Sequence, residues 1–125
     1  MASADITRAR VLFCDMLNLP RGKYVPVDVA AGGKIGFARA AFAVSYDRDL
    51  FTIPGCGYYD GLTDMELVVD EERRGSWQDM TEVALGDLYI GNEPFGLCAR
   101  SNLKRTVSEW EAIGYSPMIG LETEA

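Results

Sequence analysis

Only one stretch of the sequence has the hydrophobic periodicity of a long helix, and this limits the folds open to the chain. Its apolar residues recur at intervals of three or four positions and so share one helical face: Leu103, Val107, Trp110 and Ile113. Ser101 is a candidate N-cap, and Gly114 ends the pattern, with Pro117 just beyond it. The spacing therefore predicts one main helix over residues 101–113.

Most of the other segments are apolar runs of strand length, separated by residues that favour turns. The first run ends on Asp15, and a turn containing Asn18 and Pro20 leads into a second run, so we expect a hairpin. A short helix is expected within 27–35, further strands within 37–46, 65–70 and 76–90, a long loop at 47–63, and turns at 71–75 and 92–96. Strands with one packed helix and no internal repeat predict an α+β domain.

Length and charge narrow the class of protein. A chain of 125 residues, with 48% hydrophobic and 25% charged residues, is the size and composition of one soluble globular domain. The net charge of −7 and the lack of any long Lys/Arg cluster argue against nucleic acid as a partner. No apolar window is long enough to span a membrane and the start has no signal-peptide core, so a cytoplasmic location is expected.

The absence of histidine limits the chemistry. Without histidine, the chain cannot build His-based zinc sites, Ser-His-Asp triads or Cys-His nucleophiles. The three cysteines are widely spaced and show no CxxC pattern, which is typical of reduced, mostly buried thiols. Any reaction must therefore use carboxylates, Lys, Tyr, Cys or a bound ion.

Two acidic residues near the end of the sequence are candidate metal ligands. On a strand, Glu122 and Glu124 would project to the same face, because residues two apart do so. Two close carboxylates repel one another unless a cation lies between them, and Mg²⁺ or Mn²⁺ prefers such oxygen ligands. The same pair also fits solvated charges on a frayed chain end, and the spacing leaves both interpretations open.

Two loops carry further candidate residues. Asp15 ends a buried strand and is followed by a loop and the cations Arg21 and Lys23, which is one way to display a reactive acid. A plain turn Asp beside solvated cations is the alternative. The long loop places Tyr58 and Tyr59 among acidic residues, and a surface connection would need no more than that.

Four blocks of sequence, in order, resemble the glutamine synthetase family. They are similar to its D-x-N-G-x-x-R-G-K-x-x-P hairpin, its S/T-D-M-x-L-x-P-D strand, its P-F-x-x-C-P-R-x-x-L-K-R helix entry and its G-x-x-P-x-x-G-x-E-x-E strand, at residues 11–26, 63–70, 94–105 and 114–124. Asn18 stands where the family commonly has Gly, and Asn tolerates the left-handed conformation better than other non-glycine residues.

The resemblance implies a fold and a set of site residues. Residues 1–115 would form the family's N-terminal β-grasp domain, a mixed sheet with one main helix, and residues 116–125 the first strand of the catalytic domain. Glu122 and Glu124 match the pair that binds the two divalent ions in the family. Asp15 matches the acid that reaches into the adjacent subunit's active site and helps bind and deprotonate the ammonium or amine. Tyr58 and Tyr59 receive no role from the resemblance.

The resemblance also implies an activity. The family uses ATP and Mg²⁺ or Mn²⁺ to join the side-chain carboxylate of glutamate to ammonia or an amine, in ring-shaped homo-oligomers. The R-G-K hairpin resembles branches that use larger amines. Nucleotide-binding residues and further metal ligands are missing from the 125 residues, so we expect this stretch alone to be inactive, as a piece of a longer ligase. The alternative is a stand-alone β-grasp module that binds a protein partner and performs no catalysis.

Overall fold

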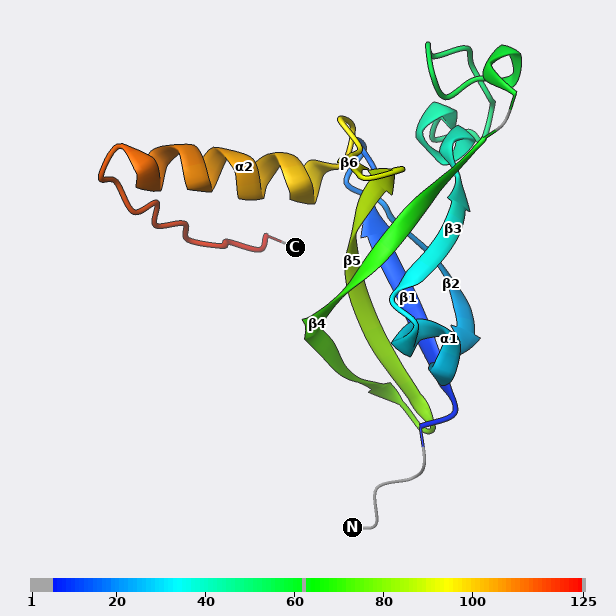
Figure 1. The fold of residues 1–125 in the computed structure, drawn as a ribbon, viewed down its shortest axis with the longest axis horizontal. Helices are drawn as coiled ribbons and strands as arrows, with labels where there is room; N and C mark the ends of the chain where they lie inside the picture. Colours follow the sequence, from blue (N-terminus) through cyan, green and yellow to red (C-terminus); the bar gives the residue numbers. More distant parts are fainter. Residues whose placement is uncertain (1–5, 62, 125) are drawn as a thin grey trace.

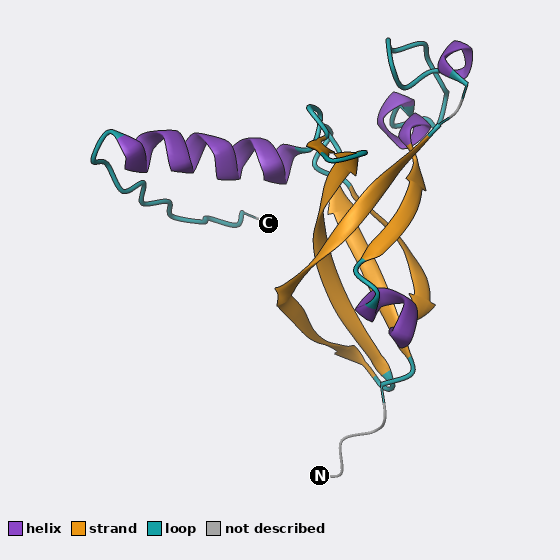
Figure 2. Cartoon of the chain, viewed as in Figure 1, coloured by secondary structure: helices purple, strands orange, loops and turns teal. Residues whose placement is uncertain are grey.

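The strands form one twisted mixed sheet in the computed structural model, which describes residues 6–61 and 63–124 (Figures 1 and 2). The strand order is β2-β1-β5-β4-β3, and β6 pairs with β5. The bounds are β1 (Arg8–Cys14), β2 (Pro20–Pro26), β3 (Lys34–Ala38), β4 (Asp64–Gln78), β5 (Thr81–Ile90) and β6 (Glu93–Pro94). With the short helix α1 (Val27–Ala31) and the main helix α2 (Ala99–Ala112), this confirms an α+β, β-grasp-like fold. The expected domain limits at residues 1 and 125 lie outside the described residues.

The predicted hairpin of β1 and β2 is confirmed. The two strands pair antiparallel from Arg8 opposite Pro26 to Cys14 opposite Pro20, and β1 also pairs parallel with β5. Alternate residues of β1 point into the core, so Ala9, Val11 and Phe13 are buried. The period-two pattern of the sequence thus sets which face of β1 is inside.

Four phenylalanine rings make a continuous cluster at the end of the sheet where β1 finishes. Phe13 stacks on Phe42 at 5.7 Å between ring centroids and meets the edge of Phe37 at 5.1 Å. Phe42 in turn meets Phe95 edge to face at 5.0 Å. Phe13, Phe42 and Phe95 are buried and Phe37 is partly buried. Because full burial of such a side chain stabilises a fold by about 1.5–3 kcal/mol, the cluster holds these segments together.

The sheet curls until its two edge strands approach one another. The Lys23 ammonium of β2 donates to the backbone oxygen of Gly36 in β3 at 2.5 Å. The same ammonium lies 4.7 Å from the centroid of the Phe37 ring, a cation–π contact. A side chain therefore bridges the gap that backbone pairing leaves open.

Two predicted elements are wrong in their extent. The strand expected within residues 37–46 ends at Ala38, and a 3₁₀ turn, Arg39–Ala43, follows because it turns Phe42 and Ala43 into the core. The turn expected at residues 71–75 is instead the middle of β4, where the pairing with β5 shifts register between Val69 and Arg74. Beyond this bulge, Arg74 pairs with Glu82 of β5 at 2.7 Å, and it also pairs with Glu71 in the bulged segment at 2.8 Å.

Helix α2 differs from the expectation at its start and in its packing. It begins at Ala99 with the buried Cys98 as N-cap residue, so Ser101 lies inside the helix. None of its residues is buried, and Figures 1 and 2 show it projecting away from the sheet. The apolar stripe therefore does not pack on the sheet: Leu103, Trp110 and Ile113 are more than half exposed.

Helix α2 ends at the glycine cap that the sequence predicted. Gly114 has φ 88°, and the amides of Gly114 and Tyr115 donate to the oxygens of Glu111 and Trp110, as at a glycine C′ position. The chain then runs back beside the helix (Figure 1). Within residues 115–124 the structure assigns no helix or strand, so a strand at 116–125 stays a prediction. Among the described residues, no helix combines the length and apolarity that a bilayer span needs.

Gly22 allows the close approach of β1 and β2 and provides a test of the hairpin. A Cβ at this position would collide with the backbone oxygen of Val11 and lie 2.5 Å from Leu12 Cδ2. We expect Gly22→Ala to lower the free energy of unfolding by about 1–3 kcal/mol, measured by urea denaturation. Gly96→Ala is the control, because a Cβ there meets no atom within 4 Å. Equal stability of the two variants would contradict the register.

Candidate functional site

Asp15 lies at the tip of the β1–β2 hairpin, as predicted, but its carboxylate points inward. Asp15 is only 4% exposed. Its Oδ1 atom accepts hydrogen bonds from the amides of Leu17 and Leu19, both at 2.9 Å, and Oδ2 accepts one from Arg21 Nε at 2.6 Å. An Asp that bonds to following amides in this way organises a turn. The carboxylate therefore stabilises the backbone turn at the hairpin tip.

The backbone of the tip agrees with this arrangement. The Asp15 amide donates to the Leu19 oxygen, and the Asn18 amide donates to the Asp15 oxygen, both at 3.1 Å. Asn18 has φ 58°, which is the left-handed conformation that the sequence predicted it would tolerate. Met16 and Leu17 are the large apolar residues exposed at the tip, and Asn18 beside them is exposed as well.

Of the two cations near Asp15 in the sequence, the structure brings one to the carboxylate. Arg21 uses only Nε for this contact, and its Nη2 atom is buried without a hydrogen-bond acceptor among the described residues. The Arg21 side chain remains 28% exposed. Lys23 turns away to the Gly36 oxygen. The tip thus holds one ion pair with a single hydrogen bond, which is weaker than a two-bond fork.

Glu122 and Glu124 lie in the extended segment after α2. Both are exposed, and neither forms an ion pair with any described residue. Across residues 6–61 and 63–124, no group of three or more acidic, histidine or cysteine side chains could hold a metal ion. The two carboxylates fit Mg²⁺ in chemistry, because it prefers oxygen ligands, but further ligands would have to come from elsewhere.

Local contacts stabilise the loop that carries Tyr58 and Tyr59. The rings of Tyr58 and Tyr59 meet edge to face at 5.9 Å and are 69% and 86% exposed. Asp60 Oδ2 accepts a hydrogen bond from the Gly57 amide at 2.9 Å, and Gly61 follows with φ 82°. Nearby, Cys56 is buried, and this burial raises the pKa of its thiol, so it is a poor nucleophile.

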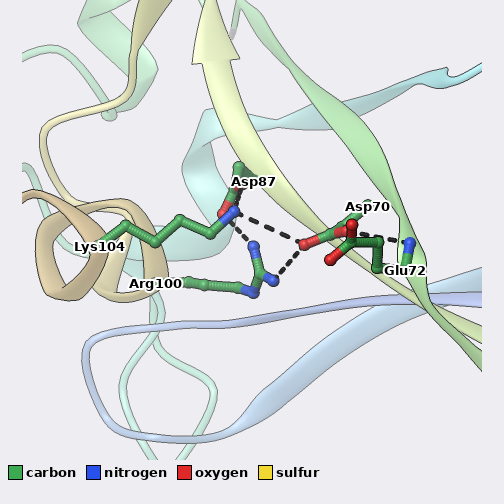
Figure 3. Close-up of polar contacts among 5 residues, drawn as sticks. All are labelled: Asp70, Glu72, Asp87, Arg100 and Lys104. Atoms are coloured by element: carbon green, nitrogen blue, oxygen red, sulfur yellow. Dashed lines mark hydrogen bonds and ion pairs between the residues drawn. The ribbon is translucent and has the colours of Figure 1, made fainter.

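Sequence reasoning missed the ionic cluster that attaches α2 to the sheet (Figure 3). We call it the helix clamp: Asp70 of β4, Asp87 of β5, and Arg100 and Lys104 of α2. Arg100 donates to Asp87 Oδ1 at 2.7 Å and to Asp70 Oδ2 at 2.5 Å, and Lys104 donates to Asp87 Oδ2 at 2.6 Å. One guanidinium therefore joins two neighbouring strands to the helix.

A signal for the helix clamp was present in the sequence. Arg100 and Lys104 lie one turn apart in the first half of the helix, where cations are unfavourable because the helix dipole places positive charge there. Such cations need acidic partners outside the helix. The hydrogen bond from Arg100 is the main reason that the pKa of Asp70 lies below its ordinary value.

A surface hollow of about 590 Å³ lies beside the helix clamp. Its lining joins the end of β5 to the start of α2 and includes Tyr89, Phe95, Asn102 and Arg105. Asp15, Glu122 and Glu124 do not line it. The described chain therefore does not gather the predicted site residues around this hollow.

Comparison with known proteins shows the fold. No known family model matches the sequence, and no curated protein is significantly similar to it. The solved structures that it resembles include apo GmaS without ligand, at 22% identity and TM-score 0.64, and a GmaS/ADP complex in conformation 1, at 21% identity and TM-score 0.66. The matches cover 86% and 88% of this chain, which spans 24% of the length of each GmaS chain.

The helix clamp predicts a pH-dependent stability. The pKa of Asp70 is lower in the folded protein than in the unfolded chain. Its contribution to the free energy of unfolding is therefore complete above the ordinary Asp pKa and is lost as pH falls through the pKa of the folded protein. We expect Asp70→Asn to lower the urea midpoint at pH 7, and the difference from wild type to shrink on acidification below about pH 4. Glu109→Gln, which removes an exposed pair with Arg105, is the control. A difference that does not change with pH would contradict the role of Asp70.

Proposed function

We propose that the chain is the N-terminal domain of a glutamine synthetase-like ligase that joins glutamate to ammonia or an amine with the use of ATP. The observation that carries this proposal is the likeness to GmaS over 86–88% of the chain. GmaS is a gamma-glutamylmethylamide synthetase of the glutamine synthetase family. The four sequence blocks that resemble this family, in the same order, support the same conclusion independently of the fold.

In this proposal the domain contributes an interface to the enzyme. Apolar side chains are exposed along α2 and the segment after it, most of all at Met118 and Leu121, which are both 96% exposed. A contiguous exposed apolar face is typical of a surface that packs against other protein. We propose that it packs within a homo-oligomer, against a catalytic domain whose nucleotide-binding residues lie outside these 125 residues.

The proposed reaction needs charge neutralisation and proton removal. The γ-phosphoryl group of ATP moves to the glutamate side chain, and the amine nitrogen then attacks the acyl carbon while phosphate leaves. When bound, Mg²⁺ or Mn²⁺ offsets the negative charge that these groups bring together. Glu122 and Glu124 supply two oxygen ligands for these ions, and the remaining ligands would come from the catalytic domain.

Asp15 is proposed to bind the ammonium form of the amine in a neighbouring subunit and to accept its proton. A carboxylate can perform both steps, because it stabilises the cation and is a base. In the structure this carboxylate is 4% exposed and accepts hydrogen bonds from Arg21 and from two backbone amides, so the hairpin tip has to rearrange before an amine can reach it. The apolar side chains of Met16 and Leu17, exposed at the same tip, suit an alkylamine better than ammonia.

The second candidate function is a β-grasp module that binds a protein partner without catalysis. The exposed rings of Tyr58 and Tyr59 favour it, because tyrosine is enriched at protein interfaces. The gene distinguishes the two functions. A reading frame that continues beyond Ala125 into nucleotide-binding and further acidic metal-ligand motifs supports the ligase and contradicts the module.

The ligase is tested by phosphate release. The protein encoded by the complete gene should release phosphate from ATP when glutamate and either methylamine or ammonium chloride are both present, with Mg²⁺ or Mn²⁺. The 125-residue chain alone should release none under the same conditions. Release that is independent of both amines would rule out an amide ligase, and synthesis of the amide by the short chain would show that no further domain is needed.

The metal ligands are tested separately. In the complete protein, we expect Glu124→Ala to reduce turnover by at least about 100-fold. Loss of this carboxylate weakens binding of the metal ion, and without the ion the negatively charged phosphate and glutamate carboxylate groups repel one another. Titration with Mn²⁺ should show the affinity falling in parallel. Glu93→Ala is the matched control, since Glu93 is exposed on β6 and has no proposed role. Unchanged Mn²⁺ affinity in Glu124→Ala would refute the ligand assignment.

A further inference from the structure

The face of the sheet that points away from the core carries two arginines without an acidic partner. Ala9, Val11 and Phe13 of β1 are buried, so Arg8 and Arg10 project from the opposite face. Neither guanidinium forms an ion pair with a described residue, although the chain has 19 acidic and only 12 basic residues. Two positive charges on this face are therefore available to another molecule.

Aromatic rings hold both guanidinium groups in place. The Arg10 guanidinium lies 4.6 Å from the centroid of the Trp77 ring, and that of Arg8 lies 5.2 Å from the centroid of the Tyr24 ring. Stacking of this kind orients the planar group and leaves the N–H donors at its edge for hydrogen bonds. Trp77 and Tyr24 are themselves about half exposed, so both rings can also contact another molecule.

The two arginines differ in their hydrogen bonds. Arg8 Nε donates to Thr81 Oγ1 at 2.8 Å, so part of its capacity is used. Arg10 is half-buried, yet its side chain donates no hydrogen bond to a described residue, and none of its nitrogens is sealed from solvent. A carboxylate suits this group best, because it accepts two parallel hydrogen bonds from a guanidinium.

Apolar side chains surround the arginines. Val83 of β5 lies opposite Arg10 in the sheet register, and Leu85 lies opposite Leu12. Arginine, tyrosine and tryptophan are enriched where proteins meet one another, and they dominate the binding energy of many interfaces. We call this surface the arginine face: Arg8, Arg10, Leu12, Tyr24, Trp77, Val83 and Leu85.

We propose that the arginine face binds a carboxylate-bearing segment of a neighbouring copy of the protein, an inference that rests on the proposed ligase and its homo-oligomer. The charges favour this partner, because a chain with a net charge of −7 offers carboxylates to the two arginines when it meets a copy of itself. The same net charge disfavours nucleic acid. The carboxylate accepts two hydrogen bonds from Arg10, and apolar groups beside it pack on Trp77 and Leu85.

Cross-linking of the complete protein identifies the partner. In Arg10→Lys, a carbodiimide joins the introduced amine to a carboxylate in contact with it, and mass spectrometry locates the new amide. In assemblies formed from isotope-labelled and unlabelled copies mixed beforehand, we expect this amide to join a labelled to an unlabelled peptide. Cross-links within one copy only, or no more than Arg73→Lys forms, overturn the proposal. Arg73 is the matched control because it is exposed on β4 and has no ion pair with a described residue.

The mass of the assembly gives a second readout. Arg10→Glu should lower the weight-average mass of the complete protein, measured by sedimentation at low salt, by at least about twofold, because it brings like charges together. Arg10→Met, which removes the cation without adding an acid, should raise the dissociation constant of the assembly by at least about tenfold. Arg73→Glu should leave the mass unchanged, and circular dichroism verifies the fold of each variant. A wild-type mass in both Arg10 variants overturns the proposal.

Phosphate release separates this inference from the proposed function. If the wild-type protein shows no amine-stimulated release but its mass falls in Arg10→Glu, the ligase fails and the contact between copies stands. Amine-stimulated release with an unchanged mass in both Arg10 variants contradicts the contact alone. A wild-type mass that falls on treatment with nuclease would assign the arginine face to nucleic acid and would also overturn the proposal.

Discussion

The contact among four phenylalanine rings decides where the functional parts of this domain lie. Phe13 is the second-last residue of β1, just before the hairpin tip, and Phe37 lies in the edge strand β3. Phe42 lies in the 3₁₀ turn, and Phe95 in the segment that leads into α2. Phe37 and Phe42 lie in consecutive elements, whereas Phe13 and Phe95 come from parts of the chain far from them and from one another. Burial of their rings in one cluster fixes the hairpin tip relative to the long loop and to the start of the main helix.

Much of the fold could be predicted from the sequence because the signals were local. The apolar run of β1, the hairpin and the glycine that ends α2 all depend on residues close to one another in the chain. The end of β3 at Ala38 and the continuation of β4 through residues 71–75 could not be predicted in this way. At Ala38 the deciding factor is burial of Phe42, and in β4 it is a bulge in the pairing with β5, and both depend on distant partners.

The site could be predicted less well than the fold. The sequence identified Asp15 as the acid at the hairpin tip, but the inward direction of its carboxylate depends on three donors that no spacing rule reveals. The helix clamp was missed because its acids lie on two strands that become neighbours only in the folded sheet. The roles of Glu122 and Glu124 stay predictions, since the structure assigns no strand to residues 115–124.

The contact of Lys23 with Gly36 affects how this domain can meet other molecules. An open sheet edge invites another chain to add a strand through backbone pairing, which is a common route to aggregation and domain swapping. Here the exposed carbonyl on β3 already has a donor from the opposite edge. Strand addition at Gly36 would first have to displace a charged side chain. This contact therefore disfavours growth of the sheet by strand addition at this carbonyl.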